Sequence, residues 1–162
     1  YNLCLPSDTA QQDKIMRGIL GKAGKGLRIT APFWCDYGYN IFIGDDFYSN
    51  HNLVILDCAP ITFGDHVFIA PNCCFSAAGH SLDVEQRNAS LEIALPITVG
   101  SNVWIGTGVT VLPGVTIGDN TVIGAGSVVT RDIPSGVVAV GNPCRVLREI
   151  TEEDKHKYKL AP

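Results

Sequence analysis

The sequence has 162 residues, enough for one domain with a substantial core, and it is 46% hydrophobic but only 17% charged. Its formal net charge of −4 argues against a general role in binding nucleic acid or an anionic membrane. It has no apolar run long enough to span a membrane, no signal-peptide core near its start and no C-x-x-C pair among its six cysteines, which together predict a cytoplasmic protein with reduced thiols.

The first 26 residues predict a helical cap. Ser7 and Asp8 are favourable N-cap residues, and apolar residues at positions 15, 16, 19 and 20 follow at helical spacing until glycines end the pattern. Such a helix would cover the open end of a β structure, whose strand edges would otherwise be unpaired. The chain begins at Tyr1 rather than Met, so it stays open whether the native N-terminus is complete.

A pattern typical of short β-strands begins at residue 27 and repeats every six residues. Ile43, Ser49 and Ile55 share one frame, which slips by two residues at Asp57–Pro60 and resumes at Phe63. In a repeat structure such a slip marks a bulged corner, and bulges are frequent beside functional sites. This corner is therefore a candidate site.

Residues 77–96, AAGHSLDVEQRNASLEIALP, interrupt the repeat. The segment is too polar and irregular for strands of this kind, yet the repeat resumes in register directly after it. A long loop that a regular scaffold does not need is a candidate functional element, and His80 lies at its base.

Residues 99–130 carry the clearest repeat in the chain. Every sixth residue is Val or Ile: Val99, Ile105, Val111, Ile117, Ile123 and Val129. Four of these six residues are followed by Gly. A period of six fits neither the 3.6-residue helix nor the two-residue alternation of a strand, and it is typical of a parallel β-helix. Each hexapeptide supplies one strand and one corner, and three of them complete a coil. The sequence therefore predicts a mainly β fold whose coils stack at about 4.8 Å.

The last part of the chain predicts a final strand at Val137–Val140, a basic and apolar strip at Cys144–Ile150 and a short helix at Thr151–Lys159. Thr151 would be the N-cap of that helix, with Asp154 completing a variant of the capping box. The predicted organisation is an N-terminal helical cap (1–26), a β-helix domain (27–150) with the ejected loop (77–96), and a C-terminal helix and tail (151–162).

Several motifs together resemble one family. The segments are NVWIGTGVTVLPGVTIGDNTVIGAGSVVTRDIP and GNPCRVLREI, with YSNHNLVILD and AAGHSLD upstream. They are similar to the hexapeptide-repeat sugar O-acetyltransferases, which include the maltose, galactoside and nodulation-factor acetyltransferases, and the resemblance covers residues 28–150. It implies a left-handed coil and a homotrimer with active sites between neighbouring subunits. It also implies direct acetyl transfer from acetyl-CoA to a hydroxyl of a sugar or glycoside.

The resemblance assigns candidate residues on the acceptor side. His80 matches the catalytic His of the family, and imidazole is suited to remove the proton of an attacking hydroxyl. Asn50 matches the Asn that holds the acceptor or the intermediate, and its amide can donate to an oxyanion. Asp57, at the frame slip, is the family-like carboxylate for acceptor hydroxyls, although the alignment also allows Cys58 in the galactoside branch. Tyr48 is a further pocket candidate.

The cofactor side follows from the repeat and from the resemblance. Trp104 stands one residue before an inward Ile, so it points outward, and the family packs this residue along the pantetheine of acetyl-CoA. Thr107 would offer its N–H or hydroxyl at the thioester, and Ala125 is small enough for the pantetheine to lie against the backbone. Four more residues match positions near the nucleotide and phosphates of CoA: Thr130, Arg131, Arg145 and Arg148. A basic cluster in an otherwise acidic chain would attract this anionic molecule.

Other interpretations stay open. The acceptor could be an amino acid or a xenobiotic instead of a sugar. A zinc enzyme similar to the γ-class carbonic anhydrases would need three convergent histidines, but His51, His66 and His80 are 15 and 14 residues apart, which are not multiples of the coil length. A non-catalytic scaffold would not need a His in a matching loop. We therefore expect an acetyltransferase that requires no metal and binds neither nucleic acid nor membrane.

Overall fold

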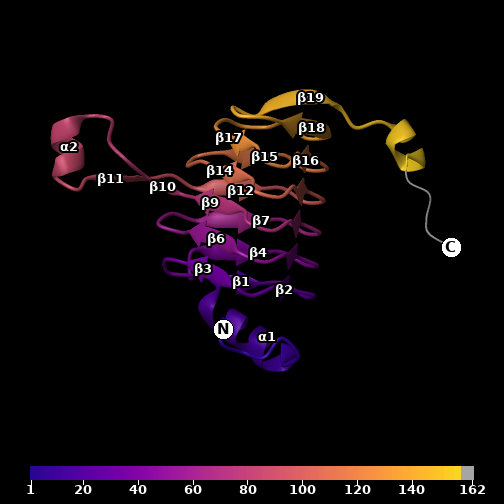
Figure 1. The fold of residues 1–162 in the computed structure, drawn as a ribbon, viewed down its shortest axis with the longest axis horizontal. Helices are drawn as coiled ribbons and strands as arrows, with labels where there is room; N and C mark the ends of the chain where they lie inside the picture. Colours follow the sequence, from indigo (N-terminus) through magenta and orange to yellow (C-terminus); the bar gives the residue numbers. More distant parts are fainter. Residues whose placement is uncertain (158–162) are drawn as a thin grey trace.

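A computed structural model, which describes residues 1–157, has the chain wound as a parallel β-helix with the first helix at one end (Figure 1). From β1 to β9 and again from β12 to β17, successive strands belong in rotation to three sheets, here called A, B and C. Sheet A contains β1 (Lys22–Ala23), β4 (Ile41–Ile43), β7 (Ile61–Phe63), β12 (Ile97–Val99) and β15 (Thr116–Ile117). Sheet B contains β2 (Arg28–Ile29), β5 (Tyr48–Ser49), β8 (Phe68–Ile69), β13 (Trp104–Ile105), β16 (Val122–Ile123), β18 (Val137–Val140) and β19 (Arg145–Glu149). Sheet C contains β3 (Phe33–Cys35), β6 (Leu53–Leu56), β9 (Cys74–Ser76), β14 (Thr110–Val111) and β17 (Val128–Val129).

The turns between sheets stack into three edges of the prism, named here by the sheets that they join: the A–B edge, the B–C edge and the C–A edge. All six residues of the predicted hexapeptide frame point inward and are at most 1% exposed. The glycines beside them are needed where coils approach closely. A Cβ on Gly106, for example, would lie 2.6 Å from the backbone nitrogen of Ala125 in the next coil. The predicted repeat and its inward face are therefore confirmed.

Aromatic side chains fill the core of the coils that contain Phe47, Phe63 and Phe75. The rings of Phe47 and Phe63 have centroids 5.3 Å apart, and those of Phe63 and Phe75 are 5.0 Å apart, both pairs edge to face. Ser49 occupies an inward position in the same frame, and its buried hydroxyl has no hydrogen-bond partner. The core thus runs through the whole prism, and only one inward position in the frame before the slip is polar.

The N-terminal cap is present, but the first coil begins earlier than predicted. Helix α1 (Thr9–Ile19) is capped by Asp8, whose side chain accepts the Gln11 N–H at 3.1 Å, and it buries Met16. Strand β1 then pairs with β4 from Lys22, before the predicted start at residue 27. A strand of two residues carries no recognisable alternation, so the sequence pattern could not reveal it.

At the other end, β18 confirms the predicted final strand, and β19 returns antiparallel to it. The predicted short C-terminal helix is a 3₁₀ helix, η1 (Glu152–His156), with Thr151 as its N-cap and Asp154 completing the capping box. The predicted end of that helix, at Lys159, lies outside the described residues. Within residues 1–157 no helix is both long and apolar enough to cross a membrane.

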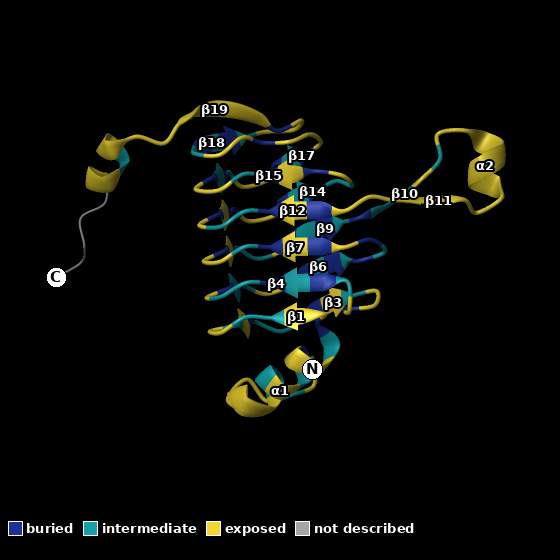
Figure 2. Ribbon diagram, turned by 180° about the vertical axis from the view of Figure 1, so that it is seen from behind, coloured by how far each residue is buried: buried dark blue, intermediate teal, exposed yellow. Residues whose placement is uncertain are grey.

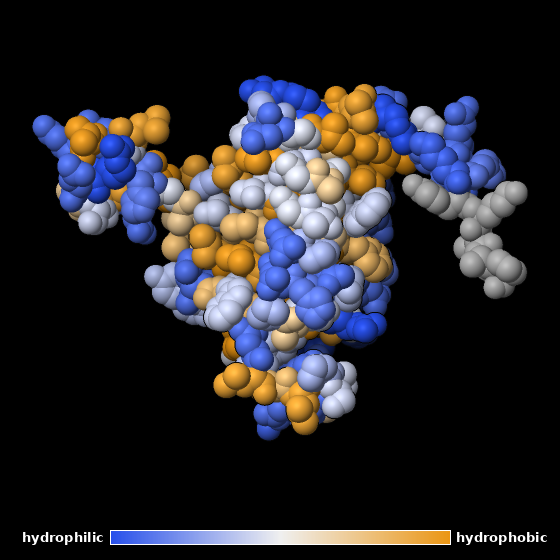
Figure 3. Space-filling view, viewed as in Figure 1, coloured by the Kyte–Doolittle hydropathy of each residue, from blue (hydrophilic) through white to orange (hydrophobic). Residues whose placement is uncertain are grey.

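The interruption at 77–96 forms an arm that stands away from the body (Figures 1 and 2). It consists of an antiparallel ribbon, β10 (Ala78–His80) with β11 (Glu92–Ala94), and a short helix, α2 (Val84–Asn88), capped by Asp83. The sequence predicted an irregular loop, because elements this short leave no periodic signal. In Figure 3 the arm is a separate lobe with apolar groups on its surface. These are Leu82, Val84, Leu91, Ile93 and Leu95.

Candidate functional site

A pocket of about 390 Å³ lies on the outer face of sheet B. We call it the sheet-B pocket, and it is lined by Tyr48, Asn50, Phe68, Ile69, Ala70 and Trp104. The strands place its aromatic residues in one column, because Tyr48 pairs with Phe68 and Phe68 with Trp104. Three predicted residues, Tyr48, Asn50 and Trp104, are thus brought together.

Asn50 lines this pocket. Its side-chain oxygen accepts the N–H of His51 at 2.7 Å, which fixes the orientation of the amide. No hydrogen bond in the described part of the chain uses the Nδ2 group of Asn50. The two N–H donors of this amide are therefore available to an oxyanion or to the oxygen of a hydroxyl group.

His80 lies elsewhere in the same chain. It is exposed on β10, at the C–A edge, directly opposite Glu92 in the ribbon. It does not line the sheet-B pocket, whose Asn50 belongs to the B–C edge. A single chain therefore does not bring the predicted base and the predicted amide together.

Asp57 is placed differently from the prediction, because its carboxylate is turned into the protein. It is 0% exposed, and its two oxygens accept the backbone N–H groups of Asp36, Tyr37 and Gly38 at 3.1, 2.9 and 2.7 Å. These bonds satisfy a buried charge and fix the corner at the frame slip. As placed, the carboxylate is turned away from solvent, and its hydrogen bonds hold the turn at 36–38.

The neighbouring Cys58 is half-buried, and its thiol donates to Asp36 Oδ2 at 3.5 Å. Burial raises the pKa of this thiol, and the hydrogen bond to Asp36 raises it further. Burial also raises the pKa values of Cys73 and Cys74, and Cys73 is fully buried. Thiols in such surroundings stay protonated and are poor nucleophiles.

The residues expected near the pantetheine line one wall. Trp104 points outward and is 55% exposed, as predicted. Thr107 and Ala125 follow each other on the B–C edge, where Gly126 N–H donates to the Thr107 carbonyl at 2.8 Å. The Thr107 N–H itself makes no hydrogen bond among residues 1–157. A free backbone donor thus lies at the same edge as Asn50.

The four residues expected near the phosphates are separated. Thr130 and Arg131 follow β17 at the C–A edge, whereas Arg145 and Arg148 lie on β19 at the end of sheet B. All four are exposed. One chain therefore offers two basic positions on different sides of the prism.

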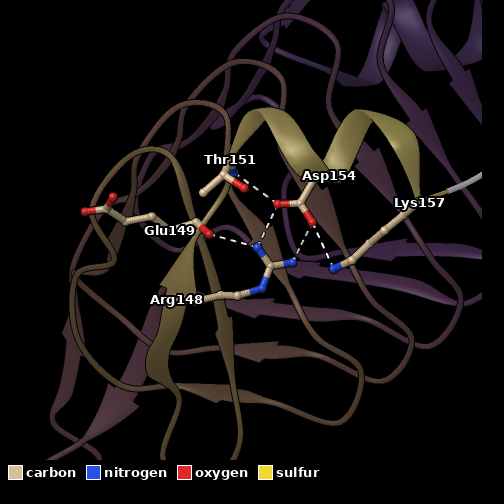
Figure 4. Close-up of polar contacts among 5 residues, drawn as sticks. All are labelled: Arg148, Glu149, Thr151, Asp154 and Lys157. Atoms are coloured by element: carbon tan, nitrogen blue, oxygen red, sulfur yellow. Dashed lines mark hydrogen bonds and ion pairs between the residues drawn. The ribbon is translucent and has the colours of Figure 1, made fainter.

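Arg148 is already paired (Figure 4). Its guanidinium donates to both oxygens of Asp154, at 2.7 and 2.8 Å, and to the Glu149 carbonyl at 2.8 Å. The bonds from Arg148, with those from Thr151 N–H and Lys157, hold the pKa of Asp154 well below its ordinary value. Arg148 is thus not a free cation in this conformation, unlike the prediction, while neither Arg131 nor Arg145 has a carboxylate partner in the described residues.

The remaining histidines do not form a cluster with His80. His51 bonds the Ala31 carbonyl at the B–C edge, and His66 lies 3.6 Å from Asp46 at the A–B edge. The three histidines of the zinc interpretation therefore occupy three different edges of one chain.

Sequence reasoning missed Phe68. It sits between Tyr48 and Trp104 in the aromatic column and is 50% exposed. Its signal was its position: it stands one residue before the inward Ile69, as Trp104 stands before Ile105. The argument that singled out Trp104 applies equally to Phe68.

Comparisons with known proteins agree with this geometry. Residues 96–131 match the family model described as bacterial transferase hexapeptide (six repeats). The chain is 48% identical over 158 residues to galactoside O-acetyltransferase of Escherichia coli (strain K12), covering 98% of this chain and 78% of that protein. It is 49% identical over 146 residues to nodulation protein L of Rhizobium meliloti, covering 90% and 80%. The structure matches that of a galactoside acetyltransferase in complex with coenzyme A with a TM-score of 0.95 and 47% identity, covering 98% and 80%. The predicted left-handed parallel β-helix is thereby confirmed.

Proposed function

The chain belongs to the hexapeptide-repeat acetyltransferase family, and from this premise we propose that it moves an acetyl group from acetyl-CoA to a hydroxyl of a sugar or glycoside. The observation that carries the proposal is the sheet-B pocket. There, an outward Trp104 and the free amide of Asn50 lie on one wall. This pairing offers an apolar surface for a pantetheine at one end and a hydrogen-bond donor for an acceptor at the other.

The residues present fit acetyl-CoA. When bound, it supplies the activated acetyl group. Trp104 would pack along the pantetheine, and the small Ala125 leaves room for an extended chain on the B–C edge. Arg131, with Thr130 beside it, and Arg145 have no carboxylate partner among the described residues. Because they lie on different sides of one prism, they would meet the phosphates from two neighbouring copies of the chain. Arg148 would join them only after leaving Asp154.

His80 would act as the general base in a direct transfer. It takes the proton of the acceptor hydroxyl as the hydroxyl oxygen bonds to the acetyl carbon, and it returns that proton to sulfur as the carbon–sulfur bond breaks. The Thr107 N–H would hold the charge that develops on the carbonyl oxygen, and Asn50 Nδ2, at the other end of the pocket, would donate to the acceptor. No cysteine is needed for this sequence of steps.

The active site would form between copies of the chain. His80 and Asn50 lie on different edges of one prism, and the arm that carries His80 exposes five apolar side chains. A neighbouring prism that covered this arm would bury them and bring its own sheet-B pocket to His80. A homotrimer, with three such sites, is the assembly we propose. The cytoplasmic location stays a prediction from the sequence.

The test is release of free thiol from acetyl-CoA across galactosides, glucosides, maltose, amino acids and aminoglycosides. We expect thiol release with hydroxylated sugars. His80→Ala should lower that rate by about 100-fold or more, because a general base contributes about that factor. His66→Ala, which removes an exposed histidine at the A–B edge, is the matched control and should be unaffected.

Two further measurements separate catalysis from assembly. Calorimetric CoA binding and the mass from light scattering should stay unchanged in His80→Ala. Near-normal turnover in this variant would contradict the proposed mechanism. Release of thiol with amino acids alone would contradict the proposed acceptor.

A further inference from the structure

The sheet-B pocket holds aromatic rings in three consecutive coils. Tyr48, Phe68 and Trp104 are Cα partners across β5, β8 and β13, and the Tyr48 and Phe68 ring centroids are 6.4 Å apart. Because neighbouring strands lie about 4.8 Å apart, the column spans about 10 Å from its first ring to its last. This length accommodates two ligand groups placed end to end.

The following step rests on the proposed function, in which two molecules must meet in this pocket. Trp104 is the ring nearest to Thr107 and Ala125 along the prism, so its end of the column belongs to the pantetheine. Asn50, which follows Tyr48 in the chain, lies at the opposite end. Phe68 and Tyr48 are therefore left for the acceptor.

The pocket's chemistry limits what this acceptor can be. None of its six lining residues is charged. An amino acid carries both an ammonium and a carboxylate. Its ammonium would lose hydration there without gaining an ionic partner, because the charged group beside Tyr48 is the Arg28 guanidinium. A cyclic sugar instead has an apolar face of C–H groups that can lie flat on an aromatic ring, with its hydroxyls directed outward to donors at the rim.

Tyr48 and Phe68, the two rings at the acceptor end of the pocket, are each supported by neighbouring residues. The guanidinium carbon of Arg28 lies 5.8 Å from the centroid of the Tyr48 ring, a cation–π contact that supports this ring from the coil below. Phe68 is anchored because the next residue, Ile69, is 1% exposed in the core. A rigid aromatic surface recognises a rigid ring better than a flexible chain, because neither partner loses much conformational freedom.

We propose that Phe68 determines acceptor specificity by stacking against the pyranose ring of the sugar, beside the amide of Asn50. An acyclic polyol with the same hydroxyl groups lacks the flat C–H face. The protein should therefore prefer a galactopyranoside to galactitol, and the preference should depend on Phe68.

The test compares steady-state kinetics of Phe68→Ala, Phe68→Leu and Phe68→Tyr with methyl galactopyranoside and with galactitol. Phe68→Ala should raise KM for the pyranoside about ten-fold, with kcat within two-fold and KM for acetyl-CoA unchanged. Phe68→Tyr, which keeps the ring, should restore KM, and the KM for galactitol should change little in all three variants.

Two control variants test whether the effect is specific to Phe68. Trp34→Ala removes an aromatic side chain of similar exposure, 56%, from sheet C and should leave both KM values unchanged. Trp104→Ala should raise KM for acetyl-CoA instead of KM for the sugar. Thermal unfolding of each variant confirms that it is folded.

The outcomes are distinct. If Phe68→Ala raises KM for acetyl-CoA, the ring belongs to the cofactor wall and the inference is overturned. It is also overturned if the pyranoside and galactitol are affected equally. If the unmodified protein releases no thiol with any sugar, the proposed function itself fails, whereas equal use of pyranoside and polyol removes only the role of Phe68.

Discussion

The B–C edge of this prism is regular, whereas the C–A edge is irregular. The B–C edge consists of short turns with small residues, such as Gly106 and Ala125, stacked coil upon coil. The C–A edge contains the frame slip at Asp57–Pro60 and then the arm at 77–96. The regular edge supplies a straight wall that suits an extended ligand. The irregular edge carries His80, the proposed general base, on an arm that reaches beyond the short repeated turns.

The two edges are also stabilised by different interactions. At the B–C edge, glycine lets one coil contact the backbone of the next. At the C–A edge, the backbone N–H groups of the turn at 36–38 donate to the carboxylate of Asp57, which lies at the frame slip of the neighbouring coil. Substitutions at the two edges should therefore lower the stability of the protein for different reasons.

The largest effect on stability is expected at the C–A edge. Asp57→Ala removes the acceptor of three buried or half-buried N–H groups and should lower the free energy of unfolding by about 3–5 kcal/mol in urea titrations. Asp57→Asn, which keeps one carbonyl oxygen, should cost about half as much, and Cys58→Ala should cost little. If Asp57→Ala instead lost activity at unchanged stability, the carboxylate would contact the acceptor after all.

A smaller effect is expected at the B–C edge. Gly106→Ala places a Cβ 2.6 Å from the Ala125 nitrogen and 2.9 Å from the Ile123 carbonyl oxygen, and neither backbone atom can move freely. Overpacking of this kind should cost about 1–3 kcal/mol of unfolding free energy. Gly79→Ala is the matched control, because nothing lies within 4 Å of its added Cβ in the arm. Equal losses in the two variants would remove the distinction between the edges.

The smallest effect is expected at the end of sheet B. Asp154→Asn breaks the bidentate pair with Arg148, so trypsin at pH 8 should cleave after Arg148 severalfold faster than in the unmodified protein. Glu153→Gln, which removes an exposed neighbouring carboxylate, should leave the rate unchanged. A rate unaffected by Asp154→Asn would show that the pair does not protect this segment.

The pH dependence of this pair follows from the same contacts. Because Arg148 lowers the pKa of Asp154, the stabilisation is present above the ordinary Asp pKa of about 4 and disappears only as the pH falls through the lower folded value. Hydrogen exchange in this segment, corrected for intrinsic rates, should therefore show equal protection at pH 8 and pH 5.

The sequence allowed much of the fold to be predicted, and less of the site. The period of six identifies inward positions directly, because each Val or Ile in the frame meets the same core environment in every coil. The break at 77–96 was equally visible. The start of β1 was not, because pairing of two residues depends on β4, a distant segment.

The environments of the site residues were harder to predict, because they also depend on distant segments of the chain. Whether Asp57 faces an acceptor or the backbone depends on where the turn at 36–38 passes, and whether Arg148 is free depends on Asp154. Both are tertiary facts with no local pattern. Phe68, in contrast, could have been found from its register with Trp104.

The arm has a consequence for how such a protein changes over time. Strand β12 pairs with β7 in register, Ile61 with Ile97, as if the chain between them were an ordinary corner. Loop-closure entropy grows only slowly with length, so a longer or shorter arm costs the scaffold little. The arm is thus an exchangeable module. Grafting another family member's arm at its two junctions should therefore leave the β-helix folded, and natural selection has the same freedom.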